Sequence, residues 1–138
     1  MNKLFAVATA LVLSAHSASA FIYDCDITRP SPDGWMGDRI VFSVDEEVET
    51  VAVVDAMIMA IQKAPILTKL ETQYGRHVIR WKLKGVKATV DGGPPSNIGT
   101  ADYKASVFPN NKLVLTVHLT GFDNVPRGEG VCTKKKKQ

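Results

Sequence analysis

The sequence contains no uninterrupted apolar stretch of the length that a membrane-spanning helix requires. Such a helix needs about 18 or more consecutive apolar residues, and the longest apolar run in this chain, Leu4–Leu13, is much shorter. A run of this length at the start of a chain is instead typical of a secretory leader. We therefore expect no membrane span, and a mature protein that is soluble.

The first 20 residues match the pattern of a secretory signal peptide. Lys3 supplies a positive charge, Leu4–Leu13 supplies the apolar segment, and Ala18–Ala20 places small residues at the positions that signal peptidase recognises. The pattern predicts cleavage before Phe21. A short, alanine-rich leader of this kind is typical of bacteria, so we expect a periplasmic or secreted protein.

Cysteine is scarce, and its two positions predict a disulfide. Cys25 and Cys132 lie near the two ends of the predicted mature chain, in a protein sent to a compartment where disulfides persist. A bridge that closes a loop of about a hundred residues stabilises a fold by roughly 4 to 5 kcal/mol. The alternative is a catalytic or metal-binding thiol pair, but the chain lacks a Cys-x-x-Cys spacing and a histidine-rich neighbourhood.

The short motifs of catalysis and nucleotide binding are also missing. There is no Gly-x-Ser-x-Gly elbow, no phosphate-binding loop and no dinucleotide fingerprint. Neither His77 nor His118 has a second metal ligand nearby in the sequence, whereas zinc needs three or four converging ligands. We expect no enzyme activity, no metal and no cofactor. A small hydrolase that uses Asp24, Asp26 or His77 is the alternative.

The formal net charge of +3 does not describe the body of the chain. Lys3 lies in the leader and four lysines form the run Lys134–Lys137, which leaves 12 basic and 14 acidic residues elsewhere. A domain with this balance does not present the basic surface of a nucleic-acid-binding protein. We interpret residues 134–138 as a disordered basic tail, with at most weak contact with an anionic surface.

Short segments with alternating polarity dominate residues 21–133, which we interpret as one domain. Phe21–Ile27 alternates apolar with polar residues, and Val78–Leu83 has an apolar face opposite a basic face. The turn 109–111 fits a β-hairpin, because asparagine adopts left-handed backbone conformations readily. We expect Val131–Cys132 to return beside the first strand.

About seven short strands with turn signals every 8 to 12 residues favour an all-β fold. The spacing is equally compatible with an antiparallel β-sandwich and with a small barrel, in either case with the termini joined by the disulfide. Residues 55–63 fit a buried strand or one short helix, since periodicity does not separate these two structures over so short a segment.

Two regions are candidates for a binding surface. Arg80, Lys82 and Lys84 share one face of a predicted strand and suit a carboxylate-rich partner, although a solvated outer face has the same pattern. Trp35 and Met36 lie in a loop rich in proline and glycine, where an exposed tryptophan is a common binding anchor. The same tryptophan is equally suited to covering an open end of the core.

Two short motifs resemble those of the small periplasmic lysozyme inhibitors of bacteria. They are Phe21-x-Tyr23-x-Cys25 and Trp81-x-x-Lys84-Gly85-x-x-Ala88. The resemblance implies a disulfide-stapled β-barrel that inhibits a hydrolase. The loop with Ser-Gly and a tyrosine, which those proteins insert into the lysozyme cleft, has no counterpart between the strands of this chain.

These observations favour a non-catalytic binding or interaction protein of the bacterial envelope. Its partner would be an unknown protein or small ligand in the exported compartment, and not a nucleic acid. The alternative function is inhibition of a secreted hydrolase such as lysozyme, with the loop Arg29–Asp38 as the inserting wedge and Trp35 at its tip.

Overall fold

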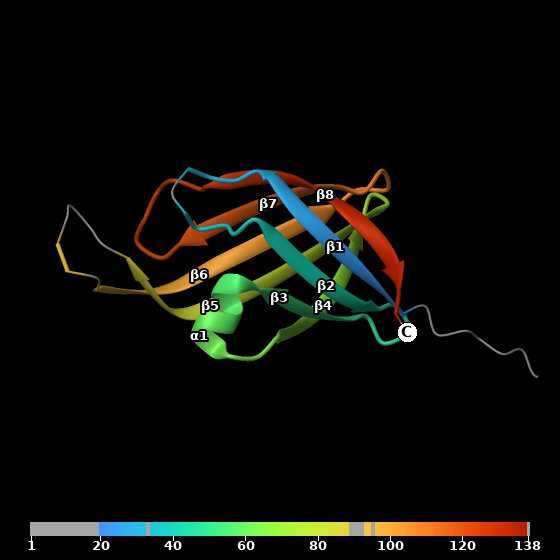
Figure 1. The fold of residues 1–138 in the computed structure, drawn as a ribbon, viewed down its shortest axis with the longest axis horizontal. Helices are drawn as coiled ribbons and strands as arrows, with labels where there is room; N and C mark the ends of the chain where they lie inside the picture. The colour runs from blue at the N-terminus through green and yellow to red at the C-terminus, as the bar shows by residue number, and fades with distance from the viewer. Residues whose placement is uncertain (1–19, 33, 89–92, 95, 138) are drawn as a thin grey trace, which may run out of the picture.

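Eight antiparallel strands close into a barrel in the computed structural model, which describes residues 20–32, 34–88, 93–94 and 96–137. Each strand pairs with the next, and the last pairs with the first (Figure 1). The elements are β1 Ala20–Arg29, β2 Arg39–Asp45, β3 Thr50–Asp55, α1 Ala56–Gln62, β4 Ile66–Gln73, β5 Arg76–Ala88, β6 Ser96–Val107, β7 Lys112–Leu119 and β8 Arg127–Lys136. The all-β prediction is confirmed, and the architecture is the barrel rather than the sandwich.

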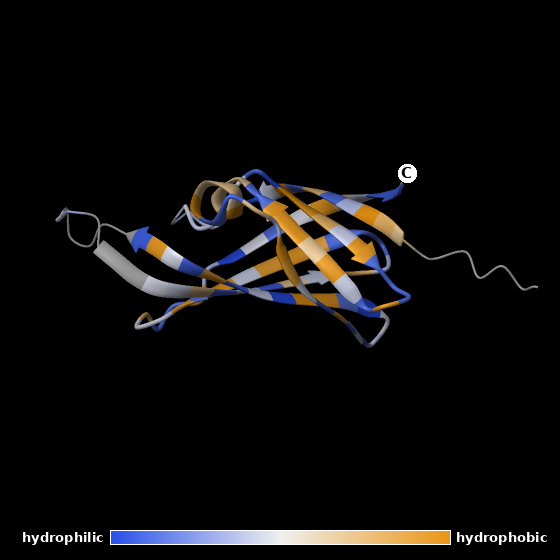
Figure 2. Cartoon of the chain, turned by 90° about the horizontal axis from the view of Figure 1, so that it is seen from below, coloured by the Kyte–Doolittle hydropathy of each residue, from blue (hydrophilic) through white to orange (hydrophobic). Residues whose placement is uncertain are grey.

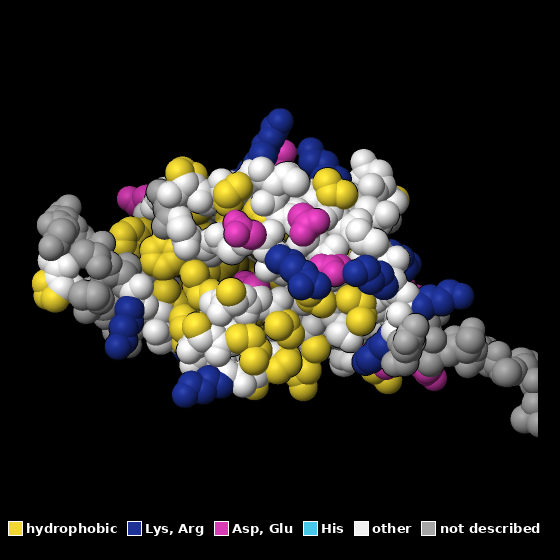
Figure 3. All heavy atoms as spheres, in the orientation of Figure 1, with side chains coloured by type: hydrophobic (Ala, Val, Ile, Leu, Met, Phe, Trp, Pro, Cys, Tyr) yellow, Lys and Arg dark blue, Asp and Glu magenta, His cyan; other side chains and the backbone are white. Residues whose placement is uncertain are grey.

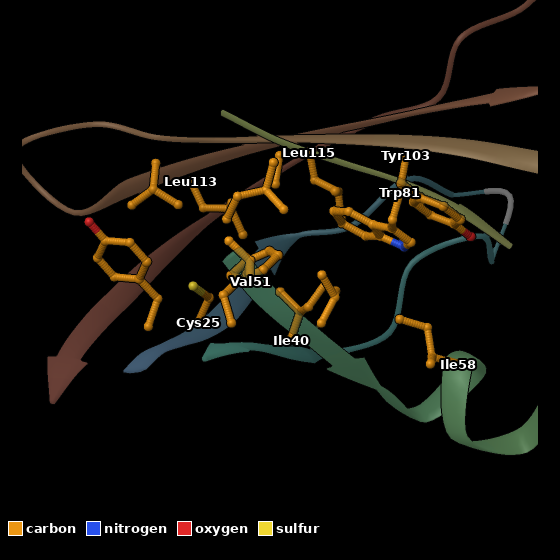
Figure 4. Close-up of a cluster of buried hydrophobic side chains, with 14 of the residues drawn as sticks. Cys25, Ile40, Val51, Ile58, Trp81, Tyr103, Leu113 and Leu115 are labelled. Atoms are coloured by element: carbon orange, nitrogen blue, oxygen red, sulfur yellow. The ribbon is translucent and has the colours of Figure 1, made fainter. Parts of the chain in front are cut away.

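The alternation of apolar and polar residues along the strands explains the closed shape. Buried apolar residues alternate with more exposed residues along strands such as β1, β2 and β7. In Figure 2 the hydropathy colours alternate along the strands. A barrel of about eight strands has an interior just wide enough for side chains to fill. Figure 4 shows the resulting core, which includes Ile40, Val51, Trp81 and Leu115. The interior is therefore packed with protein.

The disulfide joins the strands that close the barrel. Cys25 of β1 and Cys132 of β8 are directly opposite each other in the register, and the bridge links residues 107 positions apart. Both side chains belong to the buried core. The predicted pairing of the two cysteines, and the return of the last strand beside the first, are confirmed.

Residues 55–63 contain a helix. Asp55 caps it, since its carboxylate accepts a hydrogen bond from the backbone N–H of Ile58 at 2.7 Å. Lys63 ends it in a left-handed conformation. The side chain of Ile58 is completely buried and reaches into one end of the barrel (Figure 4). The Asp55 cap and the burial of Ile58 favour a helix over a strand in this segment, a choice that the hydrophobic periodicity does not make.

The lysine run is part of the barrel. Lys134, Lys135 and Lys136 extend β8 and pair with the first residues of β1. The expectation of a disordered tail that begins at Lys134 is therefore wrong for these three residues. The reason is that β1 begins at Ala20 and offers them backbone partners, while Lys135 also binds Asp24 at 2.9 Å.

The connections divide the barrel into two ends. We call the end with α1 and the β1–β2, β5–β6 and β7–β8 connections the helix end. The opposite end has the β2–β3, β4–β5 and β6–β7 turns. The first residues of β1 and the last residues of β8 also lie there, so we call it the terminal end (Figure 1). In the part of the chain that is described, no helix is long and apolar enough to cross a membrane.

Removing the disulfide should lower the free energy of unfolding substantially. For the double variant Cys25→Ala, Cys132→Ala we expect a loss of about 3 to 5 kcal/mol, because the bridge restricts the unfolded chain over a long loop. Urea unfolding measures this loss. Wild-type protein in reductant is the matched control, since it keeps both side chains, and a loss below about 1 kcal/mol in both samples would contradict the expectation.

A second substitution should stabilise the protein. Tyr74 and Gly75 form the two-residue turn between β4 and β5, and both have positive φ angles, 50° and 75°. The side chain of Tyr74 is 99% exposed, so it gains little packing in return for an unfavourable backbone conformation. Tyr74→Asn should raise the free energy of unfolding by about 0.5 to 1 kcal/mol.

Tyr74→Ala is the control for this turn, because alanine has the same difficulty with a positive φ and removes the same aromatic ring. Its free energy of unfolding in urea should stay close to that of the wild type. Equal stability of the asparagine and alanine variants would show that the backbone conformation at Tyr74 costs nothing.

Candidate functional site

A groove of about 740 Å³ crosses the outer surface of the barrel from β4 to the β7–β8 connection. Its volume lies within the range of about 300 to 1,000 Å³ that is typical of ligand sites. Because the barrel interior is filled, the groove is formed outside it, on the solvent face of the sheet. Three neighbouring strands, β5, β6 and β7, provide most of its floor.

The two margins of the groove are apolar. Leu67 of β4 lines one margin and is 79% exposed, and Val125 of the β7–β8 connection lines the groove with 52% of its surface exposed. Ile66 adds a partly buried apolar surface next to Leu67. A partner that covers these apolar side chains would stabilise the complex by about 25 cal/mol for each Å² of apolar surface that is buried.

The floor of the groove carries two rows of outward-facing polar side chains. The strand registers place Lys82 of β5 opposite Asp102 of β6, and Asp102 opposite His118 of β7. Within this row Lys82 Nζ forms an ion pair with Asp102 Oδ1 at 3.0 Å. The row is therefore internally compensated, with one cation facing one anion.

The second row has no such compensation. Arg80 lies directly opposite Lys104, and Lys104 lies opposite Thr116. In the part of the chain that the structure describes, neither Arg80 nor Lys104 has an acidic partner. Like charges directly opposite each other destabilise a sheet. An anion bound in the groove would offset the repulsion between Arg80 and Lys104.

The structure separates the candidate binding residues that the sequence indicated. Arg80 and Lys82 both line the groove, and Lys84 lies further along β5 with its side chain exposed. Met36 is only 7% exposed and belongs to the core, while Trp35 is half-buried and packs against the core. Trp35 and Met36 do not line the groove.

Sequence reasoning missed several groove residues, namely Leu67, Lys104, His118 and Val125. The alternation along residues 102–108 does predict that Lys104 faces outward. Nothing in the sequence shows that Lys104 lies next to Arg80, because that neighbourhood depends on the register between β5 and β6.

A second polar cluster lies at the terminal end. The hydroxyl oxygen of Tyr23 is 2.9 Å from Nδ1 of His77, and Nε2 of His77 is 3.7 Å from a carboxylate oxygen of Glu46. Lys134 Nζ lies 4.0 Å from the centre of the Phe21 ring. A hollow of about 220 Å³ adjoins Tyr23, His77 and Lys134.

Burial controls the electrostatics of this cluster. Burial lowers the pKa of His77 from its ordinary value; Glu46 opposes this change and Lys134 adds to it. Burial also raises the pKa of Tyr23, so the phenol stays protonated. A neutral imidazole beside a protonated phenol forms a hydrogen bond between the two side chains.

The three residues of the hydrolase alternative do not come together. Asp24 lies on the outer face of β1, where Arg39 donates hydrogen bonds to it at 2.7 and 2.8 Å and Lys135 donates one at 2.9 Å. These cations hold the pKa of Asp24 well below its ordinary value. Figure 3 shows acidic and basic side chains intermixed over the face that carries β1 and β2.

Asp26 is exposed on the same outward-facing side of β1, whereas His77 is partly buried beside Tyr23 at the terminal end. Among the residues that are described, no group of three or more His, Cys, Asp or Glu side chains gathers in a way that would hold a metal ion. The structure thus assembles no acid–base pair from Asp24, Asp26 and His77.

Comparison with protein-family models, with curated proteins and with solved structures finds no match to this chain. The resemblance to lysozyme inhibitors therefore rests on the two motifs quoted above. The closed, disulfide-bonded barrel that it implies is what the structure shows. Inhibition of a hydrolase stays a hypothesis.

The lowered pKa of His77 predicts how stability depends on pH. The unfolded chain takes up a proton near the ordinary histidine pKa of about 6.5, while the folded protein resists protonation until the pH is lower. The stabilisation is therefore complete above the unfolded pKa and is lost as the pH falls towards the folded pKa. His77→Gln should show a weaker loss of unfolding free energy between about pH 7.5 and pH 5.

Urea unfolding at the two pH values measures this difference. His118→Gln is the matched control, because it makes the same substitution at a histidine that is exposed on β7. An identical pH dependence for wild type and His77→Gln would contradict the proposed link between burial of His77 and stability.

Proposed function

We propose that this chain is an exported, non-catalytic binding protein that holds an acidic partner in the groove over β4–β7. The observation that carries the proposal is the placement of Arg80 opposite Lys104 with no acidic partner among the described residues. Export is supported by the pattern of the first 20 residues and by the disulfide, which suits an oxidising compartment.

The packed interior supports a binding surface on the outside of the barrel. Barrels of about eight strands either fill their interior with side chains or enclose one small ligand, and here buried side chains of all eight strands form the core. The groove, with a volume of about 740 Å³, is large enough for such a surface. It combines a cationic floor with apolar margins, an arrangement that complements a partner with both carboxylates and apolar side chains.

The positive charges in the groove also indicate which kind of partner it would bind best. Two cations placed directly opposite each other destabilise a sheet. Carboxylates between Arg80 and Lys104 would replace this repulsion with two attractive contacts. A cationic or neutral partner would leave the repulsion in place, so the groove discriminates in favour of anions.

Inhibition of a secreted hydrolase is the second candidate. The observation that favours it is the support of the β1–β2 loop, where the carbonyl of Trp35 accepts a hydrogen bond from the Tyr103 hydroxyl at 2.9 Å. A loop fixed in this way loses little entropy on binding. With Met36 buried, Trp35 is the residue of this loop that would contact an enzyme.

Reversal of charge in the groove tests the proposal. We expect the double variant Arg80→Glu, Lys104→Glu to bind a peptide of alternating glutamate and valine at least about tenfold more weakly than the wild type, because two ion pairs become repulsions. Isothermal titration calorimetry at physiological salt measures the affinity.

The matched control is Lys87→Glu, Lys136→Glu, which changes the net charge equally at exposed lysines outside the groove. Equal weakening in both double variants would show unspecific attraction and contradict the proposal. Trp35→Ala adds a third comparison, since loss of binding in this variant alone would favour the loop over the groove.

A further inference from the structure

The groove lies over a place where two neighbouring strands of the barrel separate. β4 and β5 pair from their common turn as far as Leu70 and Ile79. Within the described residues, the pairing does not continue to Ile66–Lys69 of β4 or to Arg80–Lys84 of β5. The residues on both sides of this opening line the groove.

The edge of β5 that faces the opening has unpaired backbone groups. The carbonyl of Arg80 points towards β4, because the hydroxyl of Thr68 donates a hydrogen bond to it at 2.6 Å. Along a strand, the N–H and C=O groups of every second residue share one edge. Lys82 and Lys84 therefore direct their peptide groups to the same edge, where no described strand pairs with them.

The facing edge of β4 has the same property. The N–H of Leu70 donates to the carbonyl of Glu49 at 2.9 Å, so Leu70 directs its peptide groups towards β3. By the same alternation Lys69 and Leu67 direct theirs towards β5. Among the described residues, two strand edges that do not pair with each other thus face each other beneath the groove, and across them the Thr68 hydroxyl donates a hydrogen bond to the Arg80 carbonyl.

The helix accounts for this separation. α1 packs against both β3 and β5, and Ile61 lies close to Gly85, at 3.9 Å from the position of a Cβ atom on that residue. Because α1 lies between these strands at the helix end, it keeps the beginning of β4 away from β5. The opening is therefore a consequence of the fold.

We propose that an extended acidic segment of a partner protein adds as a strand to β5 in this opening. The inference rests on the proposed function and specifies how the partner binds. Addition of a strand supplies backbone hydrogen bonds for affinity, and alternate side chains supply specificity. It also covers an open strand edge, which proteins otherwise protect.

The side chains around the opening define the partner sequence. On the outer side the segment meets Arg80 and Lys104, which have no acidic partner among the described residues, so carboxylates are favoured next to them, while Lys82 already pairs with Asp102. On the inner side it meets Ile66 and the buried ring of Trp81, so apolar residues are favoured between them. The lysines at the end of this chain have the wrong charge for the site and pair with β1 at the terminal end.

Amide hydrogen exchange of the full-length protein, observed by NMR, tests the inference with a peptide of about eight alternating glutamate and valine residues. In the free protein the amides of Lys82 and Leu67 should exchange fast. With saturating peptide we expect their exchange to slow by at least about tenfold, since each amide gains a hydrogen bond.

A fully N-methylated peptide of the same sequence is the matched control, because it keeps every charge and loses every backbone donor. We expect it to bind at least about tenfold more weakly than the unmodified peptide. Equal binding of the two peptides, with both weakened by Arg80→Glu, Lys104→Glu, would overturn strand addition and leave the proposed acidic partner intact.

Three other outcomes would overturn the inference. Slow exchange of the Lys82 amide in the free protein at all concentrations would mean that β4 and β5 close on each other in solution. Amide exchange that slows as the protein concentration rises would mean that a second copy of the chain binds in the opening. Failure of both peptides to bind the wild type would also contradict the proposed function.

Discussion

Pairing of β1 with β8 is the constraint on which the rest of the structure depends. These strands are the first and last of the barrel, and their pairing converts a row of hairpins into a closed barrel. The bridge between Cys25 and Cys132 sits in the middle of this pairing. Around it, Asp24 binds Arg39 on one neighbouring strand and Lys135 on the other. A covalent bond and a set of ion pairs therefore both stabilise the pairing of β1 with its neighbouring strands.

Closure has a direct consequence for function. Buried apolar side chains from all eight strands form the core of the barrel, and the proposed binding groove lies on its outer surface. Among the described residues α1 is the one helix, and it lies against β3 and β5 near the start of β4, which does not pair with β5. The barrel is thus closed where β1 pairs with β8, whereas β4 and β5 are only partly paired. The groove lies over this second place.

Much of this fold could be predicted from local pattern. Alternation in Phe21–Ile27 and Val78–Leu83 marks strands, since a strand with one wet face has a period of two. The error at Lys134 has a simple physical origin. A run of lysines has the composition of a solvated tail, yet a strand needs only backbone partners, and the early start of β1 provides them. Residues 55–63 were ambiguous because the decisive interactions, the Asp55 cap and the burial of Ile58, involve geometry beyond hydrophobic periodicity.

The sequence by itself determined that the chain forms strands with one apolar face and that two cysteines near its ends are placed to pair. It also determined that Arg80 and Lys82 face outward together. Only the tertiary structure decided that Arg80 stands opposite Lys104 and that β4 pairs with β5 from Leu70 to Gln73 but not at Ile66–Lys69. The physical reason is that alternation is a local property of each strand, whereas register and strand separation arise from packing between segments that are distant along the chain.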